Sequence, residues 1–150
     1  MGNICRSPAG EGVLTKMVDE ADLTDRIQID SAGTIGMHAG QRADSRMRTA
    51  ATNRGYDLTS RARQVKASDL HEFDLILTMD EDNHRGVLNL ATNDSQRERV
   101  HLFCSFCQSH SEREVPDPYY GGPQGFEHVL ELLEDGCNGV LDWAREKIAP

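Results

Sequence analysis

Residues 2–8 open the chain with a motif from which the rest of the fold can be worked out, Gly2-Asn3-Ile4-Cys5-Arg6-Ser7-Pro8. The pattern is typical of a tight turn that runs into a helix, with Ser7 as N-cap and Pro8 as the first helical residue. Backbone N–H groups in such a turn converge on an anion, and the helix dipole adds to the attraction. Gly2 gives the backbone freedom that the turn needs, and Arg6 offers a forked donor for two phosphate oxygens. The motif therefore predicts a phosphate-binding loop.

Helices and short strands are expected to alternate after this loop. Apolar residues recur with helical spacing behind Pro8, and Leu75-Ile76-Leu77 has the short apolar run of a buried parallel strand. Asp44 and Asp80 are placed as helix N-caps, and Gly55 is suited to end a helix. The expected elements are a helix from Ser7, a strand at 27–30, a helix from Asp44 to Gly55, a short helix at 68–72, a strand at 75–77, a helix from Asp80 and a strand at 100–104.

The strongest periodic signal lies at the end of the chain. Apolar residues there step by three or four positions, which places them on one face of a long helix that packs on a sheet. These residues are Phe126, Val129, Leu130, Leu133, Cys137, Val140, Leu141, Ala144 and Ile148. Alternating strands and helices predict an α/β class with a mostly parallel sheet, and 150 residues suit a single domain spanning 1–150. In such sheets the active site lies at the carboxyl ends of the strands.

Composition excludes several classes of protein. The net charge of −9 argues against binding to nucleic acid, which needs a basic face. No apolar run approaches the roughly 20 residues that span a bilayer, and the start of the chain does not resemble a secretory signal. No membrane association is expected. A cytoplasmic location is predicted, or a plastid if a targeting segment lies upstream.

Four cysteines are present, at positions 5, 104, 107 and 137. Free thiols in a reducing compartment are expected, because a disulfide scaffold belongs to small secreted domains. Cys104 and Cys107 form one CxxC pair, flanked by His101 and His110, but a second pair at zinc-site spacing is missing. No metal site and no cofactor are predicted.

The loop at residues 2–8 resembles the signature of the low-molecular-weight protein tyrosine phosphatase family, Cys-x-Gly-Asn-x-Cys-Arg-Ser-Pro. In that family the first cysteine attacks phosphorus and the arginine six residues later holds the phosphoryl group, a role that the match gives to Arg6. The resemblance implies that phosphate is bound by Gly2, Asn3, Ile4, Cys5, Arg6 and Ser7. Cys5 matches the family's second loop cysteine, and because Glu11 stands six residues after it, Cys5 is not expected to be the nucleophile.

A second match is Asp117-Pro118-Tyr119-Tyr120, which resembles the family's acid loop. The resemblance gives Asp117 the role of general acid and then of base, and makes Tyr119 and Tyr120 an aromatic wall for a phenyl group. Met37 occupies a position at the mouth of the pocket, where it would extend that wall.

The resemblance also supplies residues that support the loop. Ser31 would hydrogen-bond Asn3, and Ser7 would donate to a nearby thiolate. Ser60 stands where some members place a histidine that helps to hold Asn3. His38, beside Met37, is expected to face solvent. The resemblance covers essentially the whole chain.

Counting back from Arg6 puts the catalytic cysteine at the position before Met1. The family fold is a four-stranded parallel sheet of order 2-1-3-4 with helices on both faces, and strand 1 leads into that cysteine. The chain is therefore expected to lack strand 1 and to be incomplete at the N-terminus. Without the catalytic cysteine, it is expected to hydrolyse phosphate esters negligibly.

The function expected from the resemblance is phosphomonoester hydrolysis through a cysteinyl-phosphate, without a metal. The partner would be a phosphotyrosine protein or a small aryl phosphate, and the sequence leaves the oligomeric state open. Two alternatives remain open. One is an arsenate reductase of the same fold, which Cys5, Cys104 and Cys107 would serve. The other is a non-catalytic phosphate or phosphotyrosine binder.

Overall fold

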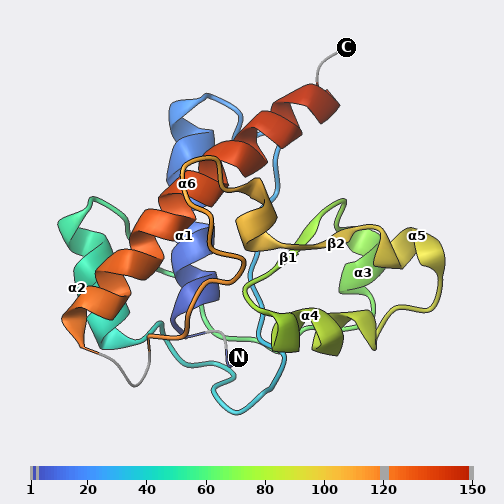
Figure 1. The fold of residues 1–150 in the computed structure, drawn as a ribbon, viewed down its shortest axis with the longest axis horizontal. Coiled ribbons are helices and arrows are strands. Elements are labelled where there is room, and N and C mark those ends of the chain that lie inside the picture. The colour runs from blue at the N-terminus through green and yellow to red at the C-terminus, as the bar shows by residue number, and fades with distance from the viewer. Residues whose placement is uncertain (1, 3, 119–121, 149–150) are drawn as a thin grey trace.

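The computed structural model describes residues 2, 4–118 and 122–148 (Figure 1). Within them, helices dominate and one small sheet lies to one side. The elements follow the chain as α1 (Arg6–Glu20), α2 (Ser45–Asn53), α3 (Asp69–Glu72), β1 (Ile76–Thr78), α4 (Glu81–Leu88), α5 (Asp94–Arg97), β2 (Val100–Leu102), the 3₁₀ helix η1 (Phe103–Phe106) and α6 (Pro123–Ile148).

Helices α1, α2 and α6 pack side by side, and we call them the helical layer (Figure 1). The apolar face predicted for the last helix is confirmed, but α6 packs it mainly against α1, α2 and η1, whereas the sequence predicted that it packs on a sheet. Its buried apolar residues include Phe126, Val129, Leu130, Leu133, Cys137, Val140 and Leu141. Burial of such a face, rather than helix propensity, supplies most of a helix's stability in a protein.

Two predicted helix caps are confirmed. The Asp44 carboxylate accepts N–H bonds from Arg46 and Met47 at the start of α2, and Asp80 accepts one from Asn83 at the start of α4. Gly55 follows α2 with a φ of +88°, which only glycine adopts without strain.

The predicted start of the first helix was wrong by two residues. Helix α1 begins at Arg6 with Cys5 as its N-cap residue, because the Cys5 carbonyl already accepts the first helical hydrogen bond from the Ala9 N–H, at 3.3 Å. The N-cap carries no side-chain hydrogen bond. Arg6 is thereby held in the first turn of the helix.

The sheet consists of β1 and β2, which run parallel with Ile76 opposite Val100 and Thr78 opposite Leu102. We call residues 69–102, with α3, α4 and α5 around this sheet, the small lobe (Figure 1). The α/β class with a parallel sheet is thus confirmed. The second strand is shorter than predicted, because residues 103–106 turn into η1.

The strand expected at residues 27–30 is absent from the structure. These residues are extended without regular pairing, and only Gly33 forms an isolated parallel bridge, to Gln64. A strand needs a partner for its backbone groups, and a cavity separates residues 27–34 from β1. Residues 27–30 therefore have the alternation of a strand, but within the described residues no strand lies beside them to pair with.

Candidate active site

The site is built around Arg6, whose side chain is only 4% exposed. Its Nη1 lies 2.7 Å from Oδ2 of Asp80 and donates to the backbone carbonyl of Val115 at 2.8 Å. Asp80 comes from the turn after β1, and Val115 from the segment that leads to Asp117. One guanidinium therefore joins three parts of the chain that are far apart in sequence.

Asp80 is held in its charged form. Burial alone would raise its pKa, but the Asn83 N–H and the Arg6 guanidinium outweigh that effect and lower the pKa below its ordinary value. The pair fixes Arg6 with one nitrogen engaged, and it leaves the buried guanidinium charge paired with a carboxylate. Sequence reasoning had assigned Asp80 only as a helix cap, because nothing in the pattern shows that its second oxygen faces Arg6.

A cavity of about 1090 Å³ opens beside this arginine. The phosphate-loop residues Gly2, Ile4, Cys5, Arg6 and Ser7 lie in its lining together with Asp117, so the structure brings the predicted loop and the predicted acid to one cavity. Three predicted residues, Asn3, Tyr119 and Tyr120, lie outside the described residues.

Met37 and His38 stand at the same cavity. Met37 is 71% exposed. His38 is only half-buried, and its ring lies so close to Gly2 that a Cβ on Gly2 would overlap it. The expectation that His38 faces solvent was therefore wrong in part. Its Nδ1 is 3.1 Å from Oε1 of Gln41, which orients the ring.

Cys5 is buried, 6% exposed, and its thiol is poorly suited to attack phosphorus. Burial raises its pKa to about 12, and the nearby carboxylates of Asp44 and Asp117 raise it in the same direction. Because the thiolate is the nucleophilic form, such a thiol is nearly inert at neutral pH. This finding agrees with the sequence argument against Cys5 as nucleophile.

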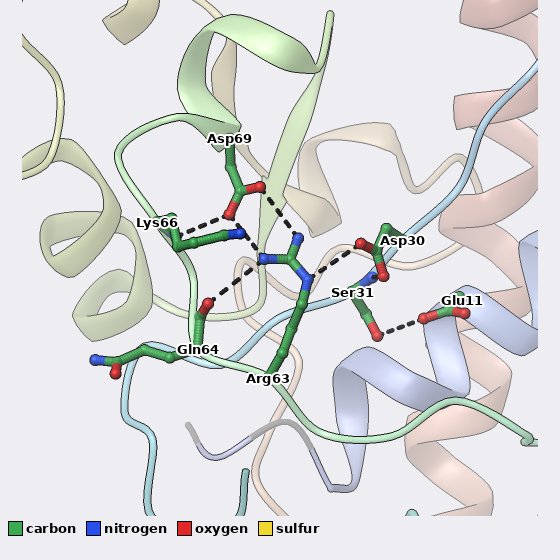
Figure 2. A network of polar contacts seen from close by, with 7 residues as sticks. All are labelled: Glu11, Asp30, Ser31, Arg63, Gln64, Lys66 and Asp69. Carbon is green, nitrogen blue, oxygen red and sulfur yellow. Dashed lines mark hydrogen bonds and ion pairs between the residues drawn. The ribbon is translucent and has the colours of Figure 1, made fainter. Parts of the chain in front are cut away.

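A polar network contributes side chains to the lining of the same cavity (Figure 2). Ser31 Oγ donates to Glu11 Oε1 at 2.5 Å, while Arg63 binds the carboxylates of Asp30 at 3.1 Å and Asp69 at 3.0 Å. The carboxylate of Asp69 also accepts the Lys66 N–H at 2.8 Å. The network joins α1, the extended residues 30–31 and α3.

Ser31 lies in the lining of the cavity, and its predicted bond to Asn3 stays a prediction because Asn3 is outside the described residues. The described partner, Glu11, was missed. Burial raises the pKa of Glu11, and the Ser31 and Ser60 hydroxyls oppose that rise. Ser60 is thus close to Glu11, and its predicted contact with Asn3 stays a prediction. A signal was available in the sequence, because Glu11 lies one turn of α1 after Ser7.

The remaining cysteines are reduced thiols. Burial raises the pKa of Cys107 to about 12, and the neighbouring Cys104 thiol adds to it. Among residues 2, 4–118 and 122–148, no three His, Cys, Asp or Glu side chains come together in a group that could hold a metal ion.

Comparison with known proteins identifies the family. A family model described as low molecular weight phosphotyrosine protein phosphatase matches residues 1–149. The chain belongs to that family. The phosphatase is 47% identical over 141 residues to a relative from Synechocystis sp., covering 94% of this chain and 90% of the relative. It is 38% identical over 149 residues to the low molecular weight protein-tyrosine-phosphatase of Streptomyces coelicolor, covering 98% and 91%.

A solved structure supports the same assignment. The protein tyrosine phosphatase of Entamoeba histolytica, with Hepes in its active site, superposes with a TM-score of 0.94 at 42% identity, covering 98% of this chain and 94% of that one. Within the described part of the chain, no helix of the phosphatase is long and apolar enough to cross a membrane.

Proposed function

We propose that this phosphatase cleaves aryl phosphate monoesters, with phosphotyrosine in proteins as the substrate class and Arg6 and Asp117 as its catalytic residues. One observation carries the proposal above the others. Arg6 is buried and fixed by Asp80 and Val115 beside a cavity that Asp117 also lines. A pre-fixed guanidinium next to a proton donor is the arrangement that phosphoryl transfer to a thiolate requires.

The chemistry then runs in two steps. A cysteine thiolate attacks phosphorus while the aryl oxygen leaves with a proton from the Asp117 carboxyl, which gives a cysteinyl-phosphate and a phenol. Water next attacks phosphorus, the Asp117 carboxylate takes its proton, and phosphate and the thiolate are released. Arg6 and the N–H groups of residues 2–7 hold the oxygens of the phosphoryl group in both steps.

The full sheet of this fold has four parallel strands in the order 2-1-3-4, and a strand between residues 27–34 and β1 belongs to it. Two features support this arrangement. The cavity has apolar walls there, with Ile27 and Ile29 on one side and Leu75 and Leu77 on the other. Within the described residues, β1 is paired along one edge only, by β2. A strand in the cavity would satisfy the other edge and bury both walls.

The nucleophile is a cysteine at the carboxyl end of that strand, six residues before Arg6. Cys5 cannot take its place, because burial keeps its thiol protonated. The strand would enter the loop at Gly2, which lies in the cavity lining with Arg6. Residues 1–150, joined to this strand, then form one domain.

Hydrolysis of p-nitrophenyl phosphate tests the proposal. The chain of 150 residues is compared with the same chain extended upstream by a strand and a cysteine. We expect turnover only in the extended chain, and its loss when the added cysteine is replaced by serine. In the extended chain, Asp117→Asn should lower the rate about 100-fold or more. Arg6→Lys keeps the charge but removes the fork, and should lower it as well.

Circular dichroism on each chain shows whether it is folded, so that inactivity and unfolding are told apart. Turnover by the unextended chain would contradict the role given to the added cysteine. If a folded extended chain is inactive but still binds phosphate, the protein is a binding module rather than an enzyme. Arsenate-dependent oxidation of the thiols would instead favour the reductase, which the raised pKa values of Cys5 and Cys107 speak against.

Several sequence predictions stay predictions. They are the phosphate contacts of Gly2, Asn3, Ile4, Cys5 and Ser7, the aromatic wall of Met37, Tyr119 and Tyr120, and the cytoplasmic location.

A further inference from the structure

The segment that carries Asp117 depends on one short turn of the small lobe. Residues 107–118 form no helix or strand, yet Val115 is completely buried. Its N–H donates to the Met79 carbonyl at 2.8 Å, and its own carbonyl accepts from Arg6. Val115 is therefore fixed between the turn at residues 79–81 and the phosphate-binding arginine.

The two residues before Val115 bind the same turn through Glu81, and we call these two contacts the clasp. The Glu114 carboxylate accepts the N–H of Glu81 at 2.7 Å, at the first residue of α4. The Glu81 carboxylate in turn accepts from Nε of Arg113 at 2.7 Å. The turn thus makes three contacts, in which Met79 binds Val115, Asp80 binds Arg6 and Glu81 binds Glu114.

We propose that Glu114 is a positioning residue for Asp117, which it keeps in register with Arg6 by anchoring residues 113–115 on the N-terminus of α4. This inference rests on the proposed catalytic roles of Arg6 and Asp117. Asp117 itself lies between Pro116 and Pro118. Proline fixes its own φ and restricts the residue before it, so a shift at Val115 is passed on to Asp117 rather than absorbed.

The two halves of the clasp contribute unequally. Arg113 and Glu81 are 75% and 36% exposed, and an ion pair so open to solvent adds little. Glu114 is exposed as well, but its bond needs only one side chain to be ordered, because the donor is the backbone N–H of Glu81. That N–H lies at a helix N-terminus, where the helix dipole favours negative charge. Glu114 is therefore the residue whose loss should free the segment, and Arg113 provides a matched control in the same clasp.

Amide hydrogen exchange on the chain itself gives the first test, without any need for turnover. Glu114→Ala should lower the protection of the Val115 N–H about tenfold, the effect of losing one hydrogen bond that holds the segment. Glu114→Gln keeps an oxygen acceptor and should restore most of that protection. Arg113→Ala should change it less than Glu114→Ala, and Glu98→Ala, an exposed carboxylate after α5, should leave it unchanged.

Two results would overturn the inference. Unchanged protection at Val115 in Glu114→Ala would show that the bond does not hold the segment. An equal loss along α6 would show that Glu114 stabilises the whole fold instead of the segment.

The leaving-group dependence in the cysteine-containing extended chain gives the second test. A misplaced acid slows phenyl phosphate, whose leaving oxygen needs a proton, more than p-nitrophenyl phosphate, whose leaving oxygen needs it less. Glu114→Ala should therefore lower kcat/KM about tenfold more for phenyl phosphate. Equal losses for both substrates would contradict the positioning role. An extended chain inactive toward both substrates would instead count against the proposed function, and the exchange data would still decide the anchoring.

Discussion

The helical layer and the small lobe are built on cores of very different size. In the helical layer, α1, α2 and α6 share one large apolar cluster that includes fully buried Met47, Phe126 and Leu133. The small lobe has a cluster of only three buried residues, Leu70, Val87 and Val100, with partly buried neighbours around it. Stability should therefore lie mainly in the helical layer, since it follows the apolar area that is buried.

Residues 75–77, at the start of β1, contact both regions because successive side chains point to opposite faces. Leu75 and Leu77 pack against the cluster of the helical layer, whereas Ile76 packs against the small cluster. The turn that follows β1 supplies Asp80, the partner of Arg6. The large core therefore stabilises the fold, while the small lobe positions the groups around the predicted phosphate-binding loop.

The largest expected effect separates the two cores directly. Leu133 and Leu70 are both completely buried, and each truncated to alanine should cost about 3 kcal/mol of unfolding free energy. Leu133→Ala should lower protection throughout the chain, because the large core carries the global transition. Leu70→Ala should loosen chiefly α3, α4 and β2. Urea unfolding followed by hydrogen exchange measures both.

A uniform loss of protection in Leu70→Ala would contradict the separation of the two cores, since it would show that the two clusters unfold as one cooperative unit.

The next effect tests how the regions are joined. In α6, Gly136 lies against the Phe103 ring and Gly139 against the Phe106 backbone, so closely that a Cβ at either glycine would overlap them. Gly139→Val should destabilise the protein by about 2 kcal/mol or more, because η1 and with it the end of β2 would have to move. Thermal unfolding measures this.

Gly125 is the matched control in the same helix, because a Cβ there would meet Pro118 at an ordinary 3.6 Å. Gly125→Ala should be neutral or slightly stabilising, as alanine is the better helix former. Equal destabilisation by the two substitutions would show that the close contact with η1 does not set the cost at Gly139.

Much of the fold was predictable because it depends on local patterns. The spacing of apolar residues predicted α6, and the short polar side chains of Asp44 and Asp80 predicted two helix starts. The missing strand at residues 27–30 does not follow from alternation, because alternation shows that a segment can form a strand but does not show whether a neighbour is present to pair with it. Only the sheet order implied by the family resemblance, with strand 1 lacking, indicates that this neighbour is gone.

Local patterns also limit how much of the candidate site could be predicted. Arg6 and Asp117 could be named from short motifs, but the residues that hold them could not. Asp80 and Val115 are 74 and 109 positions away from Arg6, and no local pattern encodes which of many acidic side chains will face it. The role of Glu114 could not be predicted for a further reason. An exposed glutamate in an acidic chain does not stand out in the sequence until its backbone partner is known.

A smaller effect concerns the loop that connects the regions. Asp135 of α6 accepts N–H bonds from Gln108, Ser109 and His110 at 2.8–2.9 Å. Burial alone would raise the pKa of the Asp135 carboxyl. The three N–H bonds and the His110 ring outweigh burial and lower this pKa from an ordinary 3.8 to about 2. The stability that the lowered pKa provides is complete above about pH 4 and is lost as the pH falls toward 2, because the unfolded chain takes up the proton first.

Urea unfolding at pH 5 and at pH 2.5 measures this contribution, which should be about 2 kcal/mol. Asp135→Asn should be less stable at pH 5 and should lose less on acidification than the wild type. Asp25→Asn, which alters an exposed aspartate, should follow the wild-type curve. If Asp135→Asn kept the full acid dependence, other carboxylates would have to carry it, and the loop would not be anchored on the helical layer by this residue.

The smallest effect on stability concerns Cys5, at the boundary between the helical layer and the cavity. Because burial raises its pKa to about 12, iodoacetamide at pH 7.5 should leave Cys5 unlabelled in the folded chain and label it after unfolding in urea. Mass spectrometry of the peptide that contains Cys5 measures this. Cys5→Ser should change the unfolding free energy by only about 1 kcal/mol, since the serine hydroxyl is nearly isosteric. Rapid labelling of the folded chain would mean that a thiolate is available at the phosphate loop, and it would return Cys5 to consideration as the nucleophile.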